Sequence, residues 1–147
     1  DVFYIGGTKS GALFGEAVVI TNDSLKRDFR YFIKQRGALL AKGRLLGVQF
    51  LALLSDGLYE QIGQQAVAQA LRIKKAFQDK GWPFLVVSPT NQQFVVVPDP
   101  VYERIRQSYS TEHNGKPDPD HTAIRFCTTW STRDEDIDAL IRDIQAL

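Results

Sequence analysis

The sequence contains little sulfur and few residues that bind metals. None of its 147 residues is methionine, and Cys127 is the only cysteine, so an internal disulfide is excluded and a reducing compartment, the cytoplasm, is expected. His113 and His121 are the only histidines, and no residue at a metal-binding spacing accompanies either of them. We therefore expect no metal site, and we expect Cys127 to pack as a small buried apolar side chain.

The sequence also lacks a strong excess of charge and any long apolar run. Its 18 basic and 17 acidic residues leave a net charge of +1, which gives no electrostatic reason to expect a nucleic acid or membrane partner. No apolar run approaches the roughly 20 residues that span a bilayer. No basic stretch precedes the short apolar run at the start, as it would in a signal peptide. The 44% of hydrophobic residues is typical of a globular protein with a packed core.

A glycine-rich turn near the start of the chain lies between two apolar segments. Val2–Ile5 and Ala17–Ile20 have the apolar, β-branched composition of short buried strands. Such a leading strand needs neighbours to bury it, and the chain starts at Asp1 without methionine. We therefore expect this sequence to be the later half of a longer protein.

Capping residues and periodicity predict helices in the first and middle parts of the chain. Asp23 or Ser24 is a suitable N-cap for a helix over Leu25–Gln35. The apolar segment Leu39–Leu54 carries two glycines four residues apart, a spacing that favours helix packing over a direct role in ligand binding. Leu58–Lys80 has helical periodicity and is followed by a glycine suited to a C-cap.

The remainder of the chain predicts a small sheet with helices. Its expected strands are Phe84–Val87, Gln93–Val97 and Thr122–Thr129, and its expected helices are Val101–Tyr109 and a last helix that opens with a capping box of Thr132 and Glu135. Residues 111–120 are expected to form a polar loop. The order from Phe84 is β-β-α-β-α, which predicts a small open sheet covered by helices on one face.

Lys9 is the first candidate functional residue. It follows Gly6, Gly7 and Thr8, where glycines let the backbone approach a ligand and Thr8 offers a hydroxyl and an amide to a phosphate. The order of residues is not that of a Walker A loop. The spacing by itself favours a solvated loop lysine over a reactive one.

Arg125 is the second candidate. In the expected strand, alternation places Ile124 and Phe126 on one face and Arg125 on the other with Ala123 and Cys127. A guanidinium on the face away from the helices binds a carboxylate through two parallel hydrogen bonds, and amino acids always present a carboxylate. The residues alone favour a structural salt bridge.

The stretch GGTKSGALFGEA, the long helix and the β-α-β-α ending together resemble the threonine aldolase/β-eliminating lyase family, whose members use pyridoxal phosphate (PLP) on the fold-type I scaffold. The resemblance covers the whole chain in order. It implies an α/β fold with the end of the PLP-binding large domain in residues 1–57, a linking helix in residues 58–81 and a small C-terminal domain in residues 82–147. In many aldolases glycine follows the lysine directly, whereas here Ser10 does.

The resemblance also implies roles for individual residues. Lys9 matches the lysine that forms the Schiff base with PLP, and Thr8 and Arg44 are expected to help bind this cofactor. Arg44 has an R-x-x-G spacing similar to a family segment near the cofactor phosphate, although a helix-surface arginine explains it equally well; Arg36 is a weaker substitute. Arg125 matches the arginine that holds the substrate carboxylate.

The function that the resemblance implies is cleavage of threonine-like β-hydroxy-α-amino acids to glycine and an aldehyde by a homo-oligomer, a dimer or a tetramer. The family places a ring-stacking histidine, a carboxylate and a phosphate-binding loop upstream of the lysine. We therefore expect the chain by itself to bind PLP poorly and to be inactive. Two alternatives remain open: another PLP-dependent lyase or aminotransferase, and a non-catalytic binding or oligomerisation module in which Lys9 and Arg125 are far apart or individually paired with carboxylates.

Overall fold

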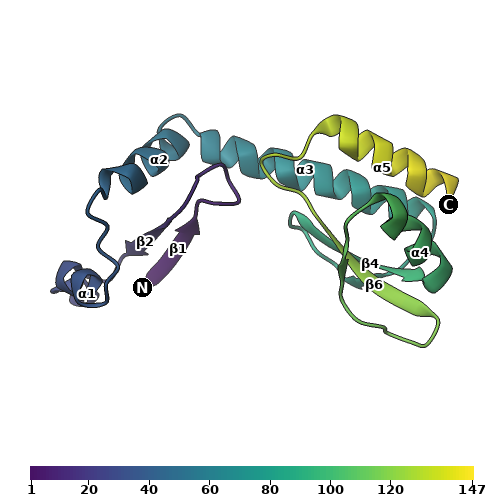
Figure 1. Cartoon of the computed structure of the whole chain (residues 1–147), viewed down its shortest axis with the longest axis horizontal. Coiled ribbons are helices and arrows are strands. Elements are labelled where there is room, and N and C mark those ends of the chain that lie inside the picture. Colours follow the sequence, from purple (N-terminus) through teal and green to yellow (C-terminus); the bar gives the residue numbers. More distant parts are fainter. The chain divides into compact units, whose positions relative to one another are not determined.

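The computed structural model describes all 147 residues, which divide into two compact units, Asp1–Gln61 and Ile62–Leu147. Figure 1 shows the helices and strands of both units and labels most of them. Helices and antiparallel strands are both present, so the α/β class expected from the sequence is confirmed. The assignment of residues 1–57, 58–81 and 82–147 to a large domain, a linking helix and a small domain stays a prediction.

The first unit opens with an antiparallel hairpin. Strand β1 (Val2–Gly6) pairs with strand β2 (Glu16–Ile20) from Val2 opposite Ile20 to Gly6 opposite Glu16. Their valine and isoleucine side chains favour the extended backbone, which explains why both strands form where the sequence predicts them. Residues 7–15 join the two strands, and Lys9 lies in this loop.

The first helix begins later than the sequence predicts. A 3₁₀ turn, η1 (Asp23–Leu25), comes first, and the residue that caps it is Asn22, whose side-chain oxygen accepts a hydrogen bond from the backbone N–H of Ser24 at 3.0 Å. Helix α1 (Phe29–Gln35) starts only after Asp28, whose φ of 56° lies in the left-handed region. Because a left-handed residue interrupts the helical hydrogen bonds, the expected start of this helix at Leu25 was wrong.

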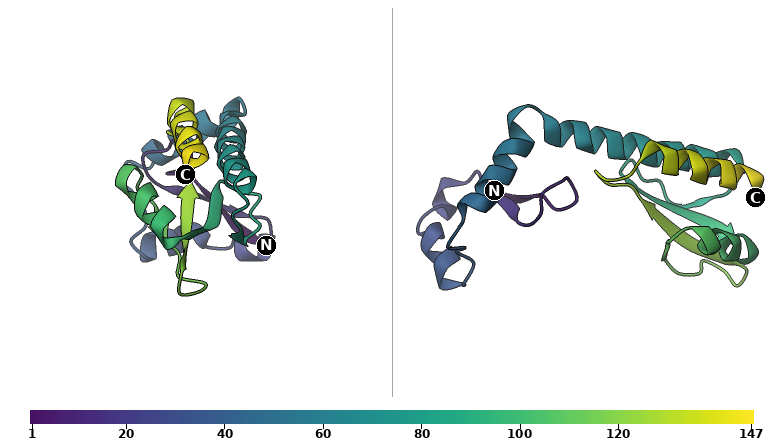
Figure 2. Two further views of the ribbon diagram at one scale, coloured as in Figure 1. Left: turned by 90° about the vertical axis from the view of Figure 1, so that its right-hand side faces the viewer. Right: turned by 45° about the horizontal axis from the view of Figure 1, so that its top comes forward.

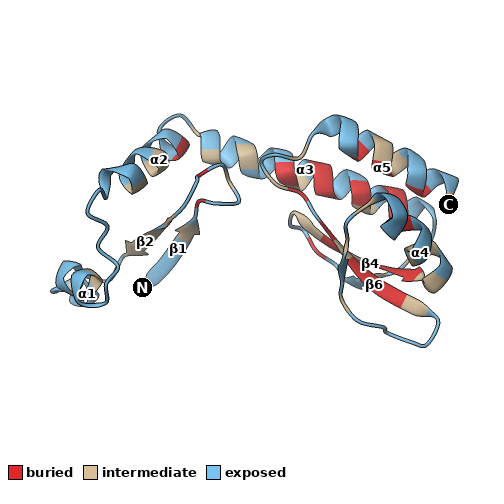
Figure 3. Ribbon diagram, viewed as in Figure 1, coloured by how far each residue is buried: buried red, intermediate tan, exposed pale blue.

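Helix α2 (Arg44–Ser55) lies wholly within the first unit. It contains the later part of the apolar segment Leu39–Leu54 described from the sequence. Few side chains of this unit are buried: Figure 3 shows it almost entirely in the colours of intermediate and exposed residues. Tyr4 is 70% exposed and Leu13 is 86% exposed. The hydrophobic effect therefore stabilises this unit by itself only weakly.

The second unit is built on a four-stranded antiparallel sheet. Its strands β3 (Phe84–Val86), β4 (Gln92–Pro98), β5 (Glu112–His113) and β6 (His121–Cys127) lie in the order β3-β4-β6-β5. The long central pair, β4 and β6, runs from Gln92 opposite Cys127 to Pro98 opposite His121. Strand β5 lies in the segment that the sequence describes as a polar loop, so this part of the expected β-β-α-β-α order gains one short strand.

Three helices pack on this sheet. They are α3 (Leu58–Asp79), which belongs to the second unit from Ile62 onwards, α4 (Asp99–Ser108) and α5 (Asp134–Ala146). Figure 2 shows α3 and α5 side by side along the sheet. The buried apolar cluster between helices and sheet consists of Ile73, Ala76, Phe77, Val95, Val97, Ile105, Ile124, Phe126, Ile137, Leu140 and Ile144. This cluster is the core of the unit, and it uses the face of β6 that alternation assigns to Ile124 and Phe126.

Polar side chains of α3 fix the start of α5. The Nε2 of Gln69, which is buried, donates to the carbonyl of Thr132 and to Asp134 Oδ1, both at 3.1 Å. Arg72 forms ion pairs with Asp134 and Asp138. These polar contacts therefore hold α5 beside α3 independently of the packing of its apolar residues.

The capping box expected at this helix start was wrong. Helix α5 begins at Asp134 with Arg133 as N-cap, and no side chain hydrogen-bonds the cap position. The hydroxyl of Thr132 instead accepts the backbone N–H of Thr129 at 2.9 Å, which closes the preceding turn. The acidic first turn of α5 interacts favourably with the helix dipole and takes over part of the stabilisation that a cap would supply. None of the helices combines the length and the apolar composition that a membrane span requires.

Candidate functional site

The loop that carries Lys9 is a tight turn closed by its own backbone. The carbonyl of Gly7 accepts the N–H of Ser10 at 2.9 Å and the N–H of Ala12 at 3.0 Å. Gly11 has a φ of 98°, which only glycine adopts readily, and it reverses the chain just after the lysine. These contacts place Lys9 at the tip of a turn whose backbone geometry the glycines determine.

Two glycines bring this loop into direct contact with α2. A Cβ atom on Gly7, which is buried, would lie 2.8 Å from the Cβ of Ala12 and 3.0 Å from the Cζ of Phe50. A Cβ atom on Gly15 would lie 2.2 Å from the Cδ2 of Leu46, and Gly15 also has a φ of 92°. Position 7 requires glycine because the Cβ of Ala12 lies in the way, and position 15 requires it because of its φ, since the end of the Leu46 side chain can shift. Glycine at both positions lets the loop pack on α2.

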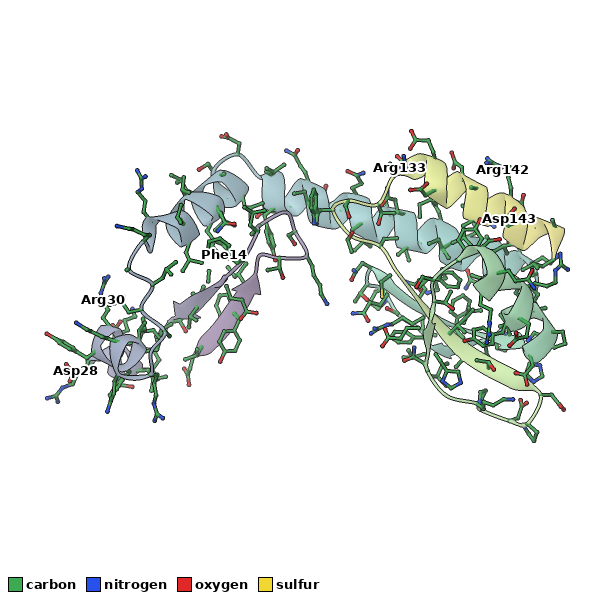
Figure 4. The ribbon with its side chains drawn as sticks, viewed as in Figure 1. Phe14, Asp28, Arg30, Arg133, Arg142 and Asp143 are labelled. Carbon is green, nitrogen blue, oxygen red and sulfur yellow. The ribbon has the colours of Figure 1, made fainter.

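Polar side chains from two helices hold the same loop. Gln49 on α2 accepts the backbone N–H of Leu13 through Oε1 at 2.7 Å and donates through Nε2 to the carbonyl of Phe14 at 3.3 Å. Phe14 is labelled in Figure 4, where it lies beside α2. The hydroxyl of Tyr59, in the first turn of α3, donates to the carbonyl of Gly6 at 3.0 Å. The loop is thus fixed just before and just after the turn that carries Lys9.

Lys9 and Thr8 themselves have no partner in this arrangement. Both residues are exposed, and no hydrogen bond or ion pair to the Lys9 amine or to the Thr8 hydroxyl is present. An amine without a neighbouring carboxylate is free to react once it loses its proton, whereas an ion-paired one is held as the ammonium. The assignment of Lys9 and Thr8 to a cofactor site stays a prediction.

Arg44 lies at the first position of α2 and is exposed. It lines a shallow hollow with Ala41, Lys42, Gly43 and Leu45, and no ion pair occupies its guanidinium. No hydrogen bond or ion pair joins it to the Lys9 loop. An anion at this hollow would meet unpaired positive charge, but the cofactor role of Arg44 stays a prediction, as does that of Arg36, which is exposed just after α1.

Arg125 lies on the face of β6 that points away from the helices, as alternation predicts. Phe94 on β4 is directly opposite it on one side, and Glu112 on β5 is directly opposite on the other. Its Nη1 donates to Gln92 Oε1 at 2.9 Å, and its Nη2 forms an ion pair with the carboxylate of Glu112. Its Nε is buried and has no hydrogen-bond partner. The guanidinium therefore already binds one carboxylate of its own chain, and its Nε–H is an unused donor.

The geometry of this cluster suits exchange of one carboxylate for another. The side chain of Glu112 is 62% exposed, whereas that of Arg125 is 28% exposed, so the acid is the more solvent-accessible partner of the pair. An exposed ion pair contributes typically less than 1 kcal/mol, so a ligand carboxylate with a bidentate geometry competes effectively with it. Arg125 and Lys9 belong to different units, and the expectation that both face one cleft stays a prediction.

Sequence reasoning missed three side chains of the site: Gln92 and Glu112, which contact Arg125, and Gln49, which contacts the loop that carries Lys9. Gln49 had a usable signal, because it shares one face of α2 with the apolar residues three before and four after it. The sequence carried no comparable signal for Gln92 and Glu112, because their contacts with Arg125 depend on strand pairing. Cys127 is exposed, so the expectation that it is buried was wrong; its place at the end of β6, on the face away from the core, explains this.

Shifted pKa values in the second unit lie in surface pairs away from Arg125. The hydrogen bond from Lys116 and then that from Thr122 lower the pKa of Asp99 at the start of α4. Burial, and then the hydrogen bond to Asp143, raise the pKa of Tyr109 to about 12. Shifted pKa values often mark catalytic groups, but here each has a structural partner that explains it. They indicate no second catalytic site, and no cluster of three metal-ligating side chains is present.

The loop, the helix that supports it and the sheet with its arginine define a class: the chain is an α/β protein similar to the C-terminal portion of PLP-type threonine aldolases. A low specificity L-threonine aldolase from a Pseudomonas species is 30% identical over 152 aligned positions, which cover 100% of this chain and 42% of that protein. The Pseudomonas aeruginosa protein of the same description is 29% identical over 99% of this chain and 41% of its own length.

A solved structure gives the same result. The threonine aldolase of Leishmania major matches 99% of this chain and 43% of its own length with a TM-score of 0.95 and 34% identity. No family model matches the sequence. The resemblance stated from the sequence is therefore confirmed, and the chain spans about 42% of the length of the curated relatives it matches.

Proposed function

We propose that this chain is the C-terminal portion of a PLP-dependent aldolase that cleaves threonine-like β-hydroxy-α-amino acids to glycine and an aldehyde. The observation that carries the proposal is similarity to threonine aldolases along the entire chain, in sequence at 30% identity and in structure with a TM-score of 0.95. A homo-oligomer and a cytoplasmic location belong to the same proposal. The large exposed apolar side chains of the first unit support it, since they are expected to pack against further protein.

The residues of the Lys9 loop fit PLP. When bound, PLP supplies an aldehyde that condenses with amines, with loss of water, and a ring that withdraws electrons from the bonds at the α-carbon of an amino acid. Lys9 offers an amine without an ion-pair partner, at the tip of a turn that two glycines, Gly7 and Gly15, bring close to α2. Thr8 offers a free hydroxyl to a phosphate, and Arg44 offers an unpaired guanidinium. These residues would hold the cofactor, and Lys9 would hold it covalently.

Arg125 binds the substrate carboxylate in this proposal. Its Nη2 exchanges the carboxylate of Glu112 for that of the amino acid, and its buried Nε is the second donor that a bidentate contact needs. Gln92 keeps its hydrogen bond to Nη1 and so holds the guanidinium plane while the exchange occurs. Binding then holds the amino acid by its carboxylate in one orientation.

Trapping with borohydride tests the role of Lys9 in the 147-residue chain. Borohydride reduces the imine that PLP forms with an amine, so even weak condensation accumulates and peptide mapping locates it. We expect Lys9 to be labelled faster than Lys34 and Lys42, which are exposed and have no ion pair either and so serve as matched references. Equal labelling of the three lysines would contradict the proposed role.

Activity requires the part of the aldolase that the chain does not span. We expect no glycine from threonine with the chain alone. Fusion of this chain to the upstream portion of the Pseudomonas relative should restore production of glycine and an aldehyde, and Lys9→Ala should abolish it. A fusion that is folded and binds PLP but gives another product, such as a keto acid, would support a different PLP-dependent lyase or an aminotransferase instead.

One observation favours the alternative of a non-catalytic module, namely the ion pair between Arg125 and Glu112. If that pair is only structural, Glu112→Gln should weaken the folded chain and leave amino acid binding unchanged. If Arg125 is a carboxylate site, the same substitution should tighten binding of an amino acid to the fusion because the competing carboxylate is gone. Arg125→Met should abolish this binding in the second case only.

A further inference from the structure

Gln49 uses both ends of its side-chain amide on the loop that carries Lys9. Its Oε1 accepts from the N–H of Leu13, and its Nε2 donates to the carbonyl of Phe14, so one side chain bonds two peptide units of the loop, Ala12–Leu13 and Phe14–Gly15. The same Nε2 donates to the carbonyl of Leu45 at 2.9 Å, within α2. That third bond fixes which end of the amide carries the hydrogens and therefore directs Oε1 at Leu13.

The helix face around Gln49 is shaped for this loop. Leu46, Gln49, Phe50 and Leu53 follow the spacing of one helical face, and Leu53 is buried. Leu46 and Phe50 lie against two glycines of the loop, Gly15 and Gly7. Gln49 lies between them, and it is the polar residue of an otherwise apolar contact.

Burial does not require these contacts of Gln49 with the loop. Leu13 is 86% exposed, so its peptide would hydrogen-bond water if Gln49 were absent. The amide therefore selects one position of an exposed loop rather than satisfying a buried group. Because Lys9 lies in the same loop, between the Tyr59 contact to Gly6 and the Gln49 contacts to residues 13 and 14, this selection determines where the amine is held.

We propose that Gln49 is a positioning residue for Lys9: its amide fixes the backbone N–H of Leu13 and the carbonyl of Phe14, and with them the turn that presents the lysine amine to an aldehyde-bearing cofactor. The role of Gln49 towards the cofactor rests on the proposed function, whereas its role in fixing the loop does not.

Two measurements on the 147-residue chain test this proposal. The first is hydrogen exchange of the Leu13 amide. Gln49→Met keeps the side-chain length and helix propensity and removes the hydrogen bonds to the loop, so we expect exchange at Leu13 to become about five- to tenfold faster, as loss of one hydrogen bond predicts. Gln49→Glu still accepts from Leu13 and should restore most of the protection. Gln64→Met, at an exposed glutamine of α3 without a side-chain hydrogen bond, is the matched control.

The second measurement is borohydride trapping with PLP in the same variants. We expect Gln49→Met to lower the labelling of Lys9 towards that of Lys42, and Gln49→Glu to retain part of the preference for Lys9. Unchanged exchange at Leu13 in Gln49→Met would overturn the proposal. Faster exchange with unchanged labelling of Lys9 would overturn the positioning of the amine. If the parent chain shows no preference for Lys9, the proposed function fails, and the exchange result still decides whether Gln49 fixes the loop.

Discussion

Truncation of Phe77 should destabilise the second unit more than any other single change in α3. Phe77 is 0% exposed, and its ring centroid lies 5.7 Å from that of Trp82 and 5.3 Å from that of Phe126. It therefore packs on the residue that follows Arg125 in β6, and it helps to set the face on which the arginine lies. Phe77→Ala tests whether this aromatic contact supports the candidate carboxylate site.

The expected loss follows from area and from the cavity left behind. A buried phenylalanine removes about 150 Å² or more of surface from water, which at about 25 cal/mol per Å² corresponds to about 4 kcal/mol. Measured Phe→Ala changes in cores are about 3 to 5 kcal/mol, which includes incomplete collapse of the cavity. Small domains have total stabilities of about 5 to 15 kcal/mol, so the loss is a large share of what is available.

Urea unfolding followed by tryptophan fluorescence measures the loss directly, since Trp82 is in contact with the altered side chain. Phe77→Leu should lose less than half as much free energy of unfolding, because it retains most of the apolar volume. Leu71→Ala is the matched control on the same helix, where the side chain is 42% exposed and the loss should be about 1 kcal/mol or less. A loss below about 1.5 kcal/mol for Phe77→Ala would refute the packing argument.

Two further predictions concern the Lys9 loop and the pH dependence of stability. Gly15→Ala combines a φ of 92° with a Cβ atom 2.2 Å from Leu46, so limited proteolysis should cut the loop faster; Gly37→Ala, with a φ of 72° and no atom within 4 Å, should show the backbone cost only. Because the pKa of Tyr109 is raised from 10.0 to about 12, by burial and then by Asp143, the folded state binds this proton more tightly. The resulting stability is present below pH 10 and is lost as pH rises towards 12; Tyr109→Phe should flatten that loss in urea midpoints measured across this range. A Gly15→Ala chain cut at the rate of the parent, or an unchanged pH profile in Tyr109→Phe, would contradict these arguments.

Most of the fold could be predicted from the sequence because its signals are local. The hairpin, α3 and the central strands of the second unit follow from apolar periodicity and from glycine positions, and they form within a few residues of where they are expected. Strand β5 could not be predicted, since Glu112 and His113 carry no apolar pattern and form a strand only by pairing with β6. The start of α1 could not be predicted either, because it depends on the left-handed backbone of Asp28.

The candidate site, like the fold, could be predicted only in part from the sequence. The face on which Arg125 lies followed from strand alternation, since β6 buries every second residue against the helices. Its carboxylate partner did not follow, because Glu112 reaches it only through the pairing of β5 with β6. The Gly-rich composition around Lys9 suggested a ligand, whereas Gly7 and Gly15 mainly allow α2 to approach. Sequence composition indicates that a close approach exists, but it does not tell which partner approaches.

The contact of Gly15 with Leu46 constrains these two positions differently during evolution. A smaller residue at position 46 removes the steric conflict, yet position 15 still needs glycine because of its left-handed φ. Position 46 can therefore change to a smaller residue while position 15 stays glycine. Position 15 cannot change even after such a substitution at position 46. Among sequences that share this loop, glycine at 15 should outlast leucine at 46.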